Sequence, residues 1–93
     1  MNCYEAATEL QGMLDAVEGG TAAAVVDALC ERAEQIKLLA LFDARNDRER
    51  HLIELAVKDV LSCLRNTDKT AHEIAIKSIT QLKRIEMEKW RAR

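Results

Sequence analysis

The sequence contains no proline, only three glycines, and one residue each of Phe, Tyr and Trp. A β-sandwich would need more turn residues and more aromatic and β-branched residues than this chain supplies. A core of Leu, Ile, Val and Ala without proline is typical of closely packed helices. The composition therefore favours an all-α protein.

The chain also lacks a strong charge of either sign and a long apolar run. Its net charge is −2, so no overall positive charge draws it to nucleic acid or to an acidic membrane. No apolar run approaches the roughly 20 residues that a membrane span requires. No basic and then apolar leader opens the chain, and its three cysteines form no Cys-x-x-Cys pair. We therefore expect a cytoplasmic protein, because a reducing compartment is the default for such cysteines.

Apolar residues recur at steps of three and four in four segments, and this spacing predicts four amphipathic helices. The predicted ranges are 2–18, 21–45, 48–65 and 70–91. The second segment is central, because the others can cover its stripe of Ala22, Val25, Val26, Leu29, Ala33, Ile36 and Ala40. We expect one domain over residues 1–93, a small up-and-down bundle of about four helices, with dimerisation as a further way to cover apolar faces.

The first helix boundaries carry clear signals. Asn2 followed by Glu5 matches a capping box at the start of the first helix. Gly19 and Gly20 end that helix, because glycine readily adopts left-handed conformations. Thr21 is the predicted cap of the second helix.

At the later boundaries, one signal leaves an alternative open and one is a clear capping box. Asn46 and Asp47 predict a turn with a new cap, and the alternative is one continuous helix over 21–65. Thr70 and Glu73 match a capping box for the last helix. A turn near residue 46 would produce a compact bundle, whereas a continuous helix would need a dimer to hide its face.

Few residues in the sequence suggest a catalytic, redox or metal-binding site. Cys30 and Cys63 would come nearly level if the chain folds back near residue 46, which allows a disulfide or thiol switch or simply the packing of two small side chains. His51 and His72 are isolated, so no metal site is expected. The sequence has no nucleophile motif, no phosphate-binding glycine loop and no His-Glu-x-x-His pattern. We therefore expect no enzyme, no catalytic or cofactor-binding residue and no cofactor.

The chain carries more apolar helix face than one small bundle easily hides. This surplus predicts a module that binds another protein, such as an adaptor, a chaperone or an inhibitor, and that forms a homodimer. Phe42 and Trp90 should lie at the same end of the bundle, where they either close that end or anchor a partner. The predicted partner-binding residues are Leu38, Leu41, Phe42, Ile76, Met87 and Trp90.

The last helix suggests the alternative function. It is rich in cations, which would let it follow a phosphate backbone as a nucleic-acid-binding regulator. Glu86 and Glu88 interrupt this basic patch. The residues that would contact nucleic acid are Lys83, Arg84, Lys89, Arg91 and Arg93.

Overall fold

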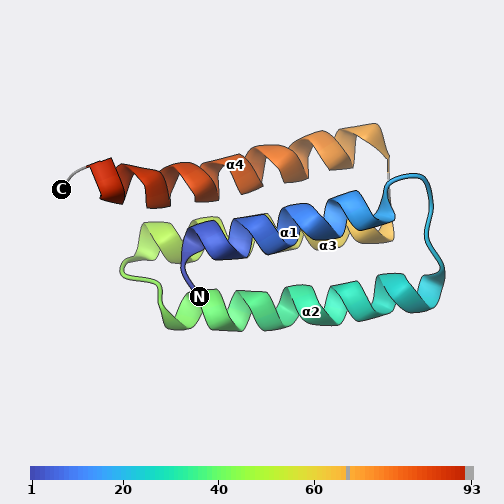
Figure 1. Cartoon of the computed structure of the whole chain (residues 1–93), viewed down its shortest axis with the longest axis horizontal. Helices are drawn as coiled ribbons and strands as arrows, with labels where there is room; N and C mark the ends of the chain where they lie inside the picture. Colours follow the sequence, from blue (N-terminus) through green and yellow to red (C-terminus); the bar gives the residue numbers. More distant parts are fainter. Residues whose placement is uncertain (67, 92–93) are drawn as a thin grey trace.

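The computed structural model describes residues 1–66 and 68–91, and this part of the chain forms four helices and no strand (Figure 1). The helices are α1 (Cys3–Val17), α2 (Ala23–Phe42), α3 (Asp47–Arg65) and α4 (Lys69–Arg91). The predicted all-α bundle of four helices is confirmed. The largest difference in bounds is at the end of α2, which was predicted at residue 45 and lies at Phe42.

Successive helices run antiparallel, and α1 and α3 form the centre of the molecule. Helices α2 and α4 lie on opposite sides of this central pair (Figure 1). Among the described residues, α2 and α4 make no contact with each other. The molecule measures 43 × 23 × 17 Å. Within the same residues, no helix is long and apolar enough to cross a lipid bilayer. One side of α2 and one side of α4 are therefore left without a neighbouring helix.

One hydrophobic core is shared by all four helices, and the predicted stripes supply it. The stripe of α2 is only partly buried, because Val25 is exposed and Val26 and Leu29 are half-buried. The largest buried apolar side chains come from the other three helices and from Ile36. These are Leu10, Leu14, Ile36, Ile53, Val57, Val60, Ile79 and Leu82.

Two of the predicted boundary signals are confirmed in detail. The Asn2 side chain accepts a hydrogen bond from the Glu5 backbone N–H at 2.8 Å, and the Glu5 carboxylate accepts one from the Asn2 N–H at 3.2 Å. This is the reciprocal capping box. Gly19 and Gly20 have φ of 87° and 101°, in the left-handed region that glycine tolerates best. They end α1 and redirect the chain toward α2.

Two predicted caps are wrong. The Thr21 hydroxyl donates back to the Ala16 carbonyl oxygen at 3.1 Å, and α2 begins without a side-chain cap. The last helix begins one residue before Thr70, and Asp68 caps it by accepting a hydrogen bond from the Ala71 N–H at 2.7 Å. The Thr21 hydroxyl had a competing acceptor, and Asp68 competed with Thr70 as the cap of the last helix. Spacing alone does not choose between such alternatives.

The turn between α2 and α3 is present, so the alternative of one continuous helix is excluded. Asn46 rather than Asp47 caps α3, because its side-chain oxygen accepts a hydrogen bond from the Glu49 N–H at 2.9 Å. Asn46 is extended, with φ of −154°, and Asp47 is the first residue of the helix. This cap fixes the start of α3 and with it the position of Glu49.

Candidate functional site

The predicted partner-binding residues lie on two different helices and differ in exposure. Phe42 and Leu38 on α2 are 90% and 66% exposed, and Trp90 and Met87 on α4 are 65% and 45% exposed. The other two predicted residues, Leu41 and Ile76, are half-buried and pack against the core. The structure therefore leaves two exposed pairs, one on α2 and one on α4.

These pairs belong to two separate apolar surfaces. The first, which we call the α2 surface, consists of Leu38, Leu39 and Phe42. The second, which we call the Trp90 surface, consists of Tyr4, Met87 and Trp90. Phe42 is the last residue of α2 and Trp90 is the residue before the last of α4, and these two helices lie on opposite sides of the α1–α3 pair (Figure 1).

The Trp90 surface is hollowed and carries positive charge. A cavity of about 480 Å³ is lined by Asn2, Tyr4, Met87, Trp90 and Arg91. The ammonium group of Lys83 lies 6.0 Å from the centre of the Tyr4 ring, within range of a cation–π interaction. This surface therefore combines aromatic and aliphatic side chains with cations at its edge.

The cations proposed for nucleic-acid binding are not all available to a phosphate backbone. Arg84 and Arg91 are exposed, but Lys83 lies against Tyr4 and Lys89 is held in an ion pair inside the bundle. Arg93 lies outside the described residues. Arg84 and Arg91 lie seven residues apart, on one side of α4, and are the two exposed cations of this set within residues 68–91.

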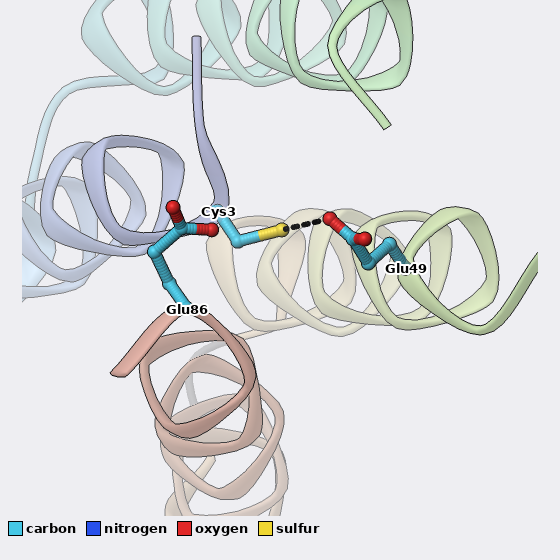
Figure 2. A group of neighbouring side chains, drawn as sticks. All are labelled: Cys3, Glu49 and Glu86. Carbon is cyan, nitrogen blue, oxygen red and sulfur yellow. Dashed lines mark hydrogen bonds between the residues drawn. The ribbon is translucent and has the colours of Figure 1, made fainter. Parts of the chain in front are cut away.

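A buried polar cluster lies at the end of the bundle where the α2–α3 turn is found. Cys3 of α1, Glu49 of α3 and Glu86 of α4 point toward one another (Figure 2). All three are almost completely buried, and Glu49 is only 1% exposed. Glu86 was expected to interrupt an exposed basic patch, and it lies in this buried cluster instead.

Lys89 neutralises part of this cluster. Its ammonium nitrogen lies 2.5 Å from one Glu49 oxygen and 3.3 Å from a Glu86 oxygen. The Asn46 side-chain amide donates to the other Glu49 oxygen at 3.2 Å, and the Cys3 sulfur lies 3.9 Å from Glu49 Oε1. Two carboxylates therefore share one ammonium group, which holds the C-terminal half of α4 against α3.

The surroundings of Cys3 and Lys89 shift the pKa of both side chains. Burial, helped by the negative charge of Glu49, raises the pKa of Cys3 to about 11. Burial alone would lower the pKa of Lys89, but the hydrogen bonds to Glu49 and Glu86 outweigh this and raise it. Cys3 is consequently a protonated thiol at neutral pH, which makes it a poor nucleophile.

The geometry of the cluster is compatible with a cation-binding site. One ligand atom each from Cys3, Glu49 and Glu86 lie within 4.8 Å of one another, so these residues could hold a cation. They border a cavity of about 390 Å³. Lys89 already supplies a positive charge at this place, so a metal ion would have to displace its ammonium group.

Cys30 and Cys63, which suggested either a thiol switch or simple packing, both belong to the hydrophobic core. All three cysteines are buried and free. Cys63 and His72 line one cavity of about 410 Å³, and burial raises the pKa of Cys63. His51 is exposed on α3. In the described part of the chain, neither histidine belongs to a group of metal-ligating atoms.

Sequence reasoning missed the buried cluster, although a signal was present. The stripe of α3 reaches Glu49 four residues before Ile53, and the stripe of α4 reaches Glu86 four residues after Leu82. Lys89 follows three residues later on the same side of α4. Opposite charges at the ends of two core stripes are compatible with a buried ion pair, and this was the signal in the sequence.

Comparison with known proteins adds nothing to this geometry. The chain matches no protein-family model, no curated protein and no solved structure.

Proposed function

We propose that this protein is a non-enzymatic helical interaction module that works by binding protein through the apolar surfaces of its helices. The observation that carries the proposal is the α2 surface, where the ring of Phe42 is 90% exposed beside Leu38. Large apolar side chains gathered on one helix face mark binding surfaces in soluble proteins. The Trp90 surface supports the same function, because exposed aromatic residues near cations are frequent binding anchors.

Self-association is part of this proposal. Helix α2 has neighbours on one side only, and its free side carries the exposed apolar residues Leu38 and Phe42, with Leu39 beside them. Association would remove this area from water and add to the modest stability of a small domain. The three free thiols fit a reducing compartment, and we propose that the module works in the cytoplasm.

The buried cluster supports a structural role better than a catalytic one. Both carboxylates are engaged by Lys89, and the Cys3 thiol is held protonated by its surroundings. A general acid, a general base or a nucleophile needs a poised group that can reach a substrate. We therefore assign the cluster to the packing of α4 and place the function on the outer helix faces.

Site-specific photocrosslinking in cells tests the proposal. A benzophenone amino acid replaces Phe42 in one variant and Trp90 in a second, and Lys58, which is exposed on α3, in a control. We expect an adduct with protein at Phe42, at Trp90 or at both, and none at Lys58. A crosslink to a second copy of the chain counts as protein.

Two results would overturn the proposal. Equal crosslinking at all three positions would show that the apolar surfaces have no special role. Adducts at Phe42 and Trp90 that disappear on nuclease treatment would favour the nucleic-acid alternative.

A further inference from the structure

The free side of α2 carries a regular pattern that the bundle itself does not use. Exposed residues follow one another at steps of four, three, four, three and four, the spacing of the a and d positions of a coiled coil. We call this row the outer seam. It consists of Ala24, Ala28, Glu31, Gln35, Leu38 and Phe42, all of them exposed.

The opposite side of α2 is the one that packs on the rest of the bundle. It consists of Cys30, Ala33, Ile36 and Ala40, all buried. The outer seam lies about half a turn away from these residues, because successive residues of a helix are about 100° apart. Val25 and Leu39 flank the seam and are also exposed. A partner helix could therefore lie along the outer seam without disturbing the core.

We propose that the outer seam binds a second copy of this chain, with the two α2 helices antiparallel and centred on residue 33. This inference rests on the proposed function and names its partner. In that arrangement Phe42 lies over the second copy's Ala24, and Leu38 over the second copy's Ala28. The N-terminal half of the seam is small and the C-terminal half is large, so an antiparallel pair fits large side chains into small ones.

The two polar residues of the seam agree with the same orientation. Glu31 and Gln35 lie symmetrically about residue 33, so each glutamate meets a glutamine amide of the second copy. A parallel pair would instead place Glu31 against Glu31, which costs electrostatic energy, and Ala24 against Ala24, which leaves a gap. Polar residues at core positions of a coiled coil fix register in this way.

Charged residues beside the centre of the seam are already neutralised within the chain. Arg32 is bound by the Glu9 carboxylate through two hydrogen bonds of 3.1 Å, and Glu34 lies 3.0 Å from the Lys37 ammonium. In an antiparallel dimer Arg32 approaches Arg32 and Glu34 approaches Glu34. The internal ion pairs reduce both repulsions.

The size of the seam sets the expected affinity. A helix of 20 residues is about 30 Å long, so a single helix pair gives an interface at the small end of the range for specific complexes. Two of the six seam residues are alanine, which limits the apolar area further. We therefore expect a reversible dimer with a micromolar dissociation constant.

Sedimentation equilibrium on the purified full chain tests the dimer. Leu38→Glu places a charge in the outer seam, and Ile74→Glu places the same charge at an exposed position of α4. We expect the dissociation constant to rise at least about tenfold for Leu38→Glu and to stay unchanged for Ile74→Glu. Leu38 is exposed, so circular dichroism should show an intact fold in both variants.

Disulfide trapping tests the orientation. Variants Ala28→Cys and Leu38→Cys, one of them carrying a mass tag, are oxidised separately and as a mixture. In the antiparallel dimer residues 28 and 38 face each other, whereas two copies of residue 28 are about 15 Å apart along the axis, too far for a disulfide. We expect a disulfide dimer from the mixture only, and none from wild type, whose cysteines are buried.

Three outcomes would overturn the inference. They are a monomer at millimolar concentration, a dimer that Leu38→Glu leaves unchanged, and a disulfide dimer from each variant alone, which shows parallel helices. A monomer would also remove self-association from the proposed function, but binding to another protein would stand if Phe42 or Trp90 still crosslinks to a different protein. An antiparallel dimer in solution, together with crosslinking to other proteins that is equal at Phe42, Trp90 and Lys58, would support the outer seam and contradict binding of another protein through the apolar surfaces.

Discussion

Replacing Lys89 with methionine should destabilise the fold far more than removing an exposed lysine. Methionine keeps most of the apolar stem and loses the ammonium group. Glu49 and Glu86 would then be two buried carboxylates without a cation. Their remaining partners are neutral, since Asn46 donates a hydrogen bond and Cys3 is a thiol.

The expected loss in the free energy of unfolding follows from the burial of the two carboxylates. Removing one partner of a buried ion pair costs about 3–5 kcal/mol, because an uncompensated charge remains in a region of low dielectric constant. The Lys89 side chain is 24% exposed, so water can approach the site and the cost should lie near the lower end, about 3 kcal/mol. A domain of this size unfolds with about 5–14 kcal/mol, so the variant should still fold.

Urea unfolding followed by circular dichroism measures this loss at neutral pH. The matched control is Lys77→Met, which removes an exposed lysine from the same helix and should change the free energy of unfolding by less than about 0.5 kcal/mol. Adding Glu49→Gln to Lys89→Met removes one orphaned charge. The double variant should be more stable than the sum of the two single changes by about 1 kcal/mol or more.

The reasoning fails if Lys89→Met is as stable as Lys77→Met. It also fails if the effects of Lys89→Met and Glu49→Gln simply add. Either result would mean that water rather than the ammonium group solvates the two carboxylates.

Two further predictions concern α1. Gly12→Ala should raise the free energy of unfolding by about 1 kcal/mol, because a Cβ there meets no atom within 4 Å, and Gly19→Ala should lower it, because φ at that position is 87°. Thermal unfolding of the two variants compares them directly. The pKa of Cys3 lies at about 11, above its usual 9.0, so the folded state keeps the proton longer than the unfolded chain does. The contribution of the buried, protonated thiol to the free energy of unfolding is complete below pH 9 and is lost as the pH rises through 11. The stability advantage of wild type over Cys3→Ala should therefore shrink between pH 9 and 11.

The number and extent of the helices were predictable because they depend on local spacing. Apolar residues at steps of three and four, with polar or glycine-containing breaks, located all four helices. The individual caps were less predictable. Thr21 and Thr70 are good capping residues, but Asp68 is equally good and Thr21 has an alternative acceptor at the end of α1. Such choices depend on which backbone groups the tertiary structure leaves nearby.

The buried cluster was not predictable from composition because its members are far apart in the sequence. Cys3, Glu49 and Glu86 meet only because the first turns of α1 and α3 lie beside the C-terminal part of α4 in the bundle. The continuation of each stripe into a charged residue was visible, but a charged residue at the end of a stripe more often faces water. The packing of three helices around this point decides the matter.

Helix α2 shows why counting apolar residues indicates a surplus of apolar side chains but not which of them stay exposed. Its inner side is made of three small residues and Ile36, so α2 can approach α1 and α3 closely while burying little apolar area. Larger residues, Leu38 and Phe42, lie on the outer side, where the bundle gives them no cover. The sequence contains both rows at helical spacing, and only the arrangement of helices shows which one is free. A helix that keeps its large apolar side chains outside its own bundle gains from packing against a second helix, which is the physical basis for proposing self-association through α2.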